Sequence, residues 1–325
     1  MGTARYLAIT GGVGGAKLAL GLANILPPGQ LAFAVNTGDD FRHLGLHISP
    51  DIDTLMYTLS GENNTATGWG RKGESWQFMG ALAQLGGETW FQLGDKDLAV
   101  HVERTRRLAA GESLTSATLA LAASLGIAHP IWPMSDDSVS TQVVTAGGPL
   151  AFQHYFVRDK CAPVVTGFAF QGSVNAKINP EILNWLEQPD LAGVILCPSN
   201  PFVSVDPLLS LPGMRERLAR CRAPVIAVSP IVAGAAIKGP AAKMMHELSL
   251  PVSATSVLQH YADFLDGFIV DALDAGLEGE MGKSGVTIMK AQTVMDSLED
   301  RIALARVCVE FCASLPVGPE AQASP

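Results

Sequence analysis

Residues 6–17 read Tyr-Leu-Ala-Ile-Thr-Gly-Gly-Val-Gly-Gly-Ala-Lys, a short apolar run that ends in a glycine-rich turn. A helical pattern follows at residues 18–25, two prolines end it, and residues 31–35 form a second apolar run. Strand, turn, helix and strand make a βαβ unit, whose two strands run parallel in one sheet. Because similar strands and helices resume beyond residue 179, the sequence predicts an α/β fold with a Rossmann-like, mostly parallel sheet core.

The glycine-rich turn has a geometry that suits an anion, because it aims backbone amides and the positive end of a helix at one place. It matches neither common nucleotide motif. A dinucleotide fingerprint needs an acid where Asn36 stands, and a Walker loop needs Ser or Thr where Leu18 follows the lysine. A tight turn without a ligand is the alternative. We expect phosphate contacts from the residues of this turn, namely Gly11, Gly12, Gly14, Gly15 and Lys17.

A second concentration of polar residues, 36–54, follows the second apolar run. It contains four carboxylates, Asp39, Asp40, Asp51 and Asp53, together with two histidines. Acids gathered at the end of a buried strand repel one another unless a cation or a ligand compensates them. A solvated acidic loop is the simpler alternative, but two acidic pairs around one short connection favour a cation or ligand site.

The composition is typical of a compact α/β enzyme, because 48% of the 325 residues are hydrophobic, 16% are charged and 33 are glycine. A formal charge of −9 argues against a general nucleic-acid binder, which needs a basic face. No apolar run is long enough to cross a membrane, and the N-terminus lacks a signal-peptide pattern. We therefore expect a soluble, cytoplasmic protein. Cys308 and Cys312, one helical turn apart, are expected in the core rather than in a metal site.

The pattern of predicted helices and strands divides the chain into a large and a small unit. Residues 113–178 contain an alanine-rich helix and then a series of short strand-like runs, at 128–133, 139–145, 150–156 and 163–170. This pattern suits a smaller inserted α+β subdomain. Residues 1–112 and 179–315 are expected to form the Rossmann-like catalytic core. The tail, 316–325, is expected to be disordered.

Further loops suited to anions follow later strands. Ser199 and Asn200 lie in a Pro-Ser-Asn-Pro turn after the strand-like run 193–197, and Lys238 lies in a glycine-rich loop after another strand. Ligands of open parallel sheets bind beyond the carboxyl ends of the strands. Amides and lysines for phosphate, with aspartates for a divalent ion, are what metal-assisted phosphoryl transfer needs. No Gly-x-Ser-x-Gly elbow occurs, which disfavours an acyl hydrolase.

Seven motifs, in order along the chain, resemble the 2-phospholactate transferase family of coenzyme F-420 biosynthesis. They are Gly-Gly-Val-Gly-Gly-Ala-Lys at 11–17, Asn-Thr-Gly-Asp-Asp at 36–40, Ser-Pro-Asp-Ile-Asp-Thr at 49–54, Leu-Gly-Asp-Lys-Asp at 93–97, Pro-Met-Ser-Asp-Asp at 133–137, Cys-Pro-Ser-Asn-Pro at 197–201 and Ser-Pro-Ile-Val at 229–232. The likeness spans most of the chain.

This resemblance implies a Mg²⁺-dependent transferase with a Rossmann-like core and a smaller subdomain, usually a homodimer. Family members take a guanosine diphospho-acid donor and transfer its phospho-acid to the ribityl hydroxyl of an acceptor, 7,8-didemethyl-8-hydroxy-5-deazariboflavin. GMP is released. The sequence leaves the donor acid open between 2-phospholactyl, phosphoenolpyruvyl and 3-phosphoglyceryl groups, because a pocket separates groups of such similar size only weakly.

Mapped onto this chain, the resemblance implies a Mg²⁺ site made of Asp39, Asp40 and Asp53, with Asp53 or Asp40 as the catalytic base. The diphosphate would lie on residues 11–17, and the guanosine side on Ser199, Asn200 and Lys238. The deazaflavin and other ligand contacts would come from a further set, namely Asp53, Gln92, Asn36, Thr37, Asp95 and Lys96.

A rival interpretation comes from relatives of the gluconeogenesis-factor type, which are non-catalytic regulators that bind nucleotide-sugars through a similar glycine loop. In that case the acids would be ligand contacts, and no product would form. A Rossmann dehydrogenase is a third interpretation, disfavoured because Asn36 stands where an acid would hold a ribose.

Overall fold

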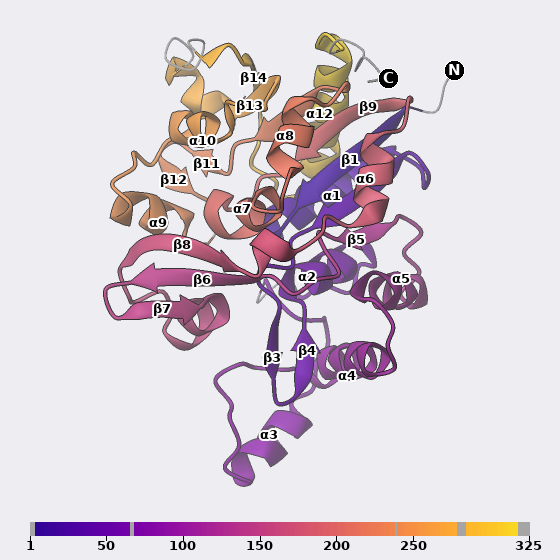
Figure 1. Cartoon of the computed structure of the whole chain (residues 1–325), viewed down its shortest axis with the longest axis vertical. Coiled ribbons are helices and arrows are strands. Elements are labelled where there is room, and N and C mark those ends of the chain that lie inside the picture. Colours follow the sequence, from indigo (N-terminus) through magenta and orange to yellow (C-terminus); the bar gives the residue numbers. More distant parts are fainter. Residues whose placement is uncertain (1–3, 66–67, 238, 278–283, 318–325) are drawn as a thin grey trace.

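A parallel sheet forms the centre of the computed structural model, which describes residues 4–65, 68–237, 239–277 and 284–317 (Figure 1). Within this described part the sheet has seven strands, and each neighbouring pair is parallel. The α/β fold with a Rossmann-like, mostly parallel core is thereby confirmed. The order across the sheet is β14 (Thr287–Ala291), β13 (Gly267–Asp271), β10 (Val225–Val228), β9 (Leu191–Leu196), β1 (Arg5–Thr10), β2 (Leu31–Val35) and β5 (Ile131–Pro133).

Both faces of this sheet are buried, as expected of parallel strands covered by helices. In β1, Leu7 and Ile9 point into one core, and Tyr6 and Ala8 into the other. The second core is closed by α1 (Gly12–Ile25), α2 (Pro50–Leu59), α4 (Asp95–Ala109), α5 (Leu114–Ser124) and α12 (Leu298–Ser314). The first is closed mainly by α6 (Pro180–Leu186), η3 (Pro201–Val205), α7 (Asp206–Leu209), α8 (Met214–Ala219), α9 (Ala241–Glu247) and α10 (Ala254–Tyr261).

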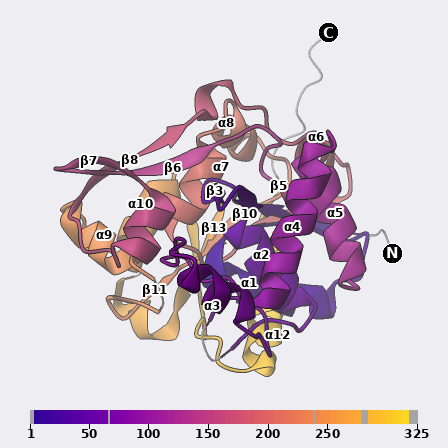
Figure 2. The same ribbon diagram turned by 90° about the horizontal axis from the view of Figure 1, so that it is seen from below.

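Smaller units extend from this core. An antiparallel sheet of β7 (Gly148–Ala151), β6 (Ser140–Thr145) and β8 (Val165–Gln171) lies on the side opposite α4 and α5 (Figure 2). The hairpin of β3 (Phe41–His43) and β4 (Leu46–Ile48) packs with α3 (Gln77–Gln84), which forms the lower end of the molecule in Figure 1. The remaining short elements are η1 (His154–Arg158), η2 (Ser173–Asn175), β11 (Ile231–Val232), β12 (Ala235–Ala236) and η4 (Ala272–Leu277).

Two of the strands expected in the smaller subdomain are placed differently by the structure. The run 128–133 was expected there, but β5 pairs with β2 at the edge of the central sheet. The run 150–156 was expected to be a strand, but β7 ends at Ala151 and the chain is helical from Phe152 into η1. The division of the chain into domains stays a prediction. Lys238 and residues 318–325 of the expected disordered tail lie outside the described residues.

No helix among the described residues is both long and apolar enough to span a bilayer.

Helices α1 and α12 touch at Gly21, whose missing side chain permits the contact. A Cβ atom built on Gly21 would lie 2.1 Å from the carbonyl oxygen of Arg301. We expect Gly21→Ala to lower the free energy of unfolding by about 1–3 kcal/mol, because the two helices must separate. Gly80→Ala in the exposed α3 is the control, since its added Cβ would have no heavy atom within 4 Å. It should be neutral or slightly stabilising. Equal urea midpoints for the two variants would contradict this account of the contact.

Candidate active site

A cavity of about 600 Å³ opens where the strand order reverses. From β1 the chain proceeds through β2 to β5 on one side, and it returns to β9 on the other side of β1. Ligands of open parallel sheets bind at such a switch point, beyond the carboxyl ends of the strands. The cavity is lined there by the glycine turn after β1, the first residues of α2, the turn after β9, and the loop after β14.

The glycine turn packs closely against the backbone and side chains of the turn after β9. A Cβ on Gly14 would lie 2.4 Å from the carbonyl oxygen of Pro198, and a Cβ on Gly15 would lie 2.7 Å from the Ser199 hydroxyl. That hydroxyl donates to the carbonyl of Gly11 at 2.8 Å. Gly15 does not line the cavity, so its role in the structure is this close packing. Gly11, Gly12 and Gly14 do line it.

Two buried carboxylates, Asp39 and Asp51, face the cavity beside this turn. Asp51 accepts a hydrogen bond from the Gly12 amide at 2.7 Å and one from the Asn36 side chain at 2.9 Å. Burial raises the pKa of Asp51 to about 6. Burial, followed by the charge of Asp51, raises the pKa of Asp39 well above its usual range. The charge of Asp51 therefore destabilises the ionised form of Asp39.

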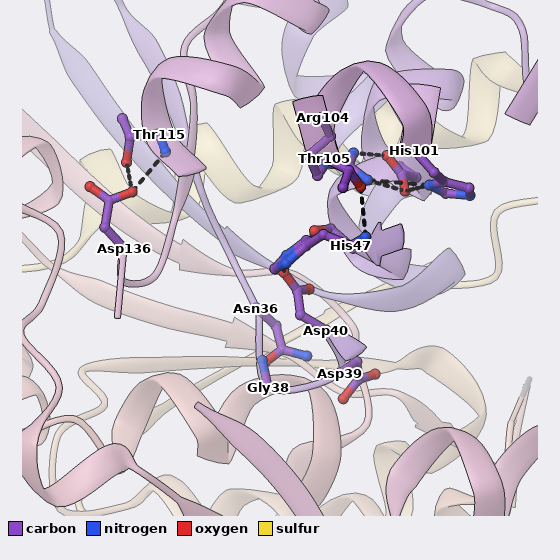
Figure 3. Close-up of polar contacts among 12 residues, drawn as sticks. Asn36, Gly38, Asp39, Asp40, His47, His101, Arg104, Thr105, Thr115 and Asp136 are labelled. Carbon is purple, nitrogen blue, oxygen red and sulfur yellow. Dashed lines mark hydrogen bonds and ion pairs between the residues drawn. The ribbon is translucent and has the colours of Figure 1, made fainter. Parts of the chain in front are cut away.

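The other two acids of the 36–54 segment point elsewhere. Asp40 accepts from the Ser49 hydroxyl at 2.7 Å and lies 3.0 Å from a ring nitrogen of His47. Figure 3 shows the Asp40 carboxylate beside His47, with the Asp39 side chain directed away from that pair. Asp53 lies on the far side of α2, because residues two apart on a helix do not share a face. Neither Asp40 nor Asp53 lines the cavity.

Asp53 instead belongs to a buried ionic cluster between α2 and α4. The Arg104 guanidinium is fully buried and contacts both carboxylate oxygens of Asp53. His101 lies between Asp53 and Asp97, with ring nitrogens 3.5 Å and 3.3 Å from their oxygens. The Tyr57 hydroxyl donates to Asp97 at 2.5 Å. Asp53, Asp97 and His101 are close enough to share an ion, but Arg104 already supplies the positive charge that Asp53 needs. The expectation that Asp53 joins Asp39 and Asp40 in one Mg²⁺ site is therefore corrected.

Lys17, Gln92, Ser199 and Asn200 line the cavity, as expected of ligand contacts. The Lys17 ammonium donates to the carbonyl of Met295 at 2.6 Å, which ties the glycine turn to the loop after β14. The Asn200 side chain accepts from the Phe202 amide and so caps η3. Asn36 and Thr37 are buried beneath the cavity and do not line it.

Asp95 and Lys96 were also expected to contact a ligand, but the Asp95 carboxylate and the Lys96 backbone amide take part in helix capping, and the Lys96 ammonium donates to the Lys72 carbonyl at 3.1 Å. Asp95 accepts from the amides of Gln77 and Phe78 at 3.1 Å, at the start of α3. The backbone amide of Lys96 donates to Glu74 at 2.7 Å, at the start of α4. Neither residue lines the large cavity. Capping, which is a common role of acids at such positions, explains these contacts.

One wall of the cavity is aromatic, and none of its aromatic residues was among the site residues predicted from the sequence. It consists of Trp69, Trp90, Phe91, Phe152 and Phe156. The first three belong to the segment between α2 and α4, and the last two follow β7. Phe152 and Phe156 stack with ring centres 5.4 Å apart. The available sequence signal for this wall was the presence of aromatic residues, such as Trp69, in a polar segment. Such a wall suits a flat aromatic ligand.

The residues at the glycine turn fit a divalent cation. The Oδ1 atom of Asp39 is buried and lacks a hydrogen-bond partner among the described residues. An unpaired carboxylate oxygen, facing a second carboxylate whose pKa is raised, is the donor set that Mg²⁺ prefers. Asp39 and Asp51 would therefore hold such an ion, in place of the set Asp39, Asp40 and Asp53.

Comparison with known proteins identifies the family of this chain. The model of the family described as "2-phospho-L-lactate transferase CofD" matches residues 7–300. A 2-phospho-L-lactate transferase from Methanosarcina mazei is 38% identical, over 93% of this chain and 98% of that protein. The chain belongs to the CofD family. A phosphoenolpyruvate transferase from Streptomyces griseus is 37% identical, over 94% of this chain and 98% of that protein.

Solved structures agree on the fold of this CofD family member. A protein of the UPF0052 family from Bacillus halodurans superposes with a TM-score of 0.61 at 13% sequence identity. The match covers 94% of this chain and 99% of the solved one. At that identity, the comparison shows a shared fold and carries no information about ligands.

The buried pair of Asp53 and Arg104 is expected to be structural. Asp53→Asn leaves the Arg104 guanidinium, which is 0% exposed, without its counter-charge. We expect a loss of about 3–5 kcal/mol in the free energy of unfolding, measured by urea denaturation. Glu103→Gln, in the exposed ion pairs of the same helix, is the control and should leave the midpoint unchanged. An Asp53→Asn protein as stable as the wild type would refute the structural role.

The raised pKa of Asp51 should make the stability of the protein depend on pH. Its pKa is about 6 in the folded protein, against about 3.9 in the unfolded chain, so its contribution is complete at low pH and is lost as pH rises through 6. We expect the stability of the wild type relative to Asp51→Asn to fall by about 2 kcal/mol between about pH 4 and about pH 7. A difference that does not change with pH would show that Asp51 is not strained.

Proposed function

We propose that this protein transfers a phospho-acid from a guanosine diphospho-acid to the ribityl hydroxyl of 7,8-didemethyl-8-hydroxy-5-deazariboflavin, with release of GMP, in coenzyme F-420 biosynthesis. Membership of the CofD family supports the reaction class. Relatives named for a phosphoenolpyruvyl and for a 2-phospholactyl group have nearly the same identity, 37% and 38%. Overall identity therefore does not select the donor acid.

The observation that carries the proposal is the mixed lining of the cavity. The lining contains the glycine turn, Lys17 and the acids Asp39 and Asp51, and it also contains the aromatic wall. A diphosphate with its cation needs the first kind of surface, and a deazaflavin ring needs the second. Both surfaces meet in one cavity, so the two substrates of a transferase could bind there together.

We assign the diphosphate to the glycine turn and Lys17, and the guanosine side to the region of Ser199 and Asn200. Asp39 and Asp51 would hold Mg²⁺. When bound, this ion neutralises phosphate oxygens and so favours attack by the hydroxyl. Asp51, whose carboxylate lines the cavity, is also our candidate to accept the hydroxyl proton. Asp51 thereby replaces Asp53 and Asp40 as the candidate base, because neither of those two acids lines the cavity.

The direct test is to incubate the purified protein with the deazaflavin, Mg²⁺ and each guanosine-linked donor, and to measure product masses and GMP. We expect product with at least one donor. Asp39→Asn should reduce the rate by roughly a hundredfold or more, because a group that acts on the reacting phosphate is lost. Asp136→Asn is the matched control, since Asp136 caps α5 through Thr115, away from the cavity (Figure 3).

Binding of a guanosine nucleotide without product from any donor would overturn the transferase proposal and favour a non-catalytic regulator of the gluconeogenesis-factor type. The homodimer implied by the family resemblance is likewise a proposal. Sedimentation equilibrium of the purified protein would decide it.

A further inference from the structure

Asn36 links the two segments that carry the cavity carboxylates Asp39 and Asp51. It follows β2 directly and is only 1% exposed. Its amide nitrogen donates to Asp51 at 2.9 Å and to the carbonyl of Val203 at 3.1 Å. Its amide oxygen accepts from the backbone of Gly38 at 2.8 Å. Both N–H groups and the carbonyl oxygen of this buried side chain are therefore engaged within the protein.

The three partners of Asn36 belong to three different walls of the cavity. Asp51 comes from α2, Val203 from η3, and Gly38 precedes Asp39 in the acidic loop. Asp51, Val203 and Asp39 all line the cavity. In Figure 3, Asn36 lies beside Gly38 at the turn from which the Asp39 side chain projects. A movement of this one side chain would therefore displace the positions of both carboxylates.

The chemistry at this position requires an amide rather than an acid. A neutral side-chain amide has two N–H groups and one carbonyl oxygen, which match one carboxylate, one backbone carbonyl and one backbone N–H. An aspartate of the same shape could accept from Gly38, but it could donate neither of the other two bonds and would place a carboxylate against Asp51. The bond from Asn36 also lowers the pKa of Asp51 against the effect of burial.

We infer that Asn36 is a positioning residue, which fixes Asp39 and Asp51 for the cation and diphosphate without touching either. The inference rests on the proposed function of that cavity. It replaces the expectation that Asn36 contacts the ligand, because the side chain lies beneath the cavity lining and its polar atoms are already bonded.

The chain offers a close control in Asn179. This asparagine is also 1% exposed and also uses all three polar positions. It donates to the Thr115 hydroxyl at 2.7 Å and to the Pro133 carbonyl at 2.9 Å, and it accepts from the Glu181 amide at 2.9 Å. Neither Asn179 nor any of these partners lines the cavity. Equal substitutions at the two positions therefore remove equal numbers of hydrogen bonds, but only the bonds of Asn36 join residues of the cavity lining.

The experiment compares Asn36→Asp and Asn36→Ala with Asn179→Asp and Asn179→Ala. Two readouts are measured: the rise in melting temperature caused by GDP with Mg²⁺, and the steady-state rate with the best donor. We expect both Asn36 variants to lose most of the ligand-induced rise. We expect their kcat to fall at least about tenfold, with the KM of the deazaflavin changed less than about twofold. The Asn179 variants should keep both properties, despite a similar loss of melting temperature without ligand.

Several outcomes would overturn the inference. One is a similar loss of ligand response and kcat in the Asn36 and Asn179 variants, which would indicate a general structural effect. Another is normal ligand response and kcat in the Asn36 variants. A third is failure of both Asn36 variants to fold while those of Asn179 fold. If the wild type gains stability from GDP with Mg²⁺ but forms no product, the proposed function fails, and the melting temperatures still decide the role of Asn36.

Discussion

Two carboxylates held close together out of water are the constraint around which this cavity is built. Burial raises the pKa of both Asp39 and Asp51, and the charge of Asp51 raises the pKa of Asp39 further. Such an arrangement costs stability unless a ligand is present. The surrounding structure maintains it with the Gly12 amide, at the positive end of α1, and with Asn36. A divalent cation on the diphosphate of a nucleotide donor would compensate the negative charge of the two carboxylates. The packing that holds them together is therefore connected to the proposed chemistry.

The buried ionic cluster between α2 and α4 stabilises the position of α2. On the side away from the cavity, Asp53 is paired with the buried Arg104, and Tyr57 is bonded to Asp97 of α4. Helix α2 therefore carries one acid toward the ligand cavity and another toward a permanent partner. Because its second face is fixed by ionic and apolar contacts, Asp51 is held at a set distance from the glycine turn. Asp51 and Asp53, which are separated by one residue in the sequence, consequently have different roles.

Local sequence patterns predicted much of this molecule. The first βαβ unit, the glycine turn and the turn at Ser199 were predictable, because their signals lie within a few adjacent residues. Asp53 was expected at the ligand site, whereas Asp51 lines the cavity in the structure, because the two acids lie on different faces of a helix that begins at Pro50. The pairing of Asp53 with Arg104 joins residues 51 positions apart, and the edge strand β5 has only three residues. Such features depend on tertiary contacts that no short pattern encodes.

The central claim is that Asp39 and Asp51 together hold a divalent cation beside the glycine turn. Titration of the protein with Mn²⁺ in the presence of GDP, followed by the electron paramagnetic resonance signal of free Mn²⁺, tests it most directly. We expect saturable binding by the wild type and by Asp136→Asn, and its loss in both Asp39→Asn and Asp51→Asn. Unchanged Mn²⁺ affinity in those two variants would contradict the account.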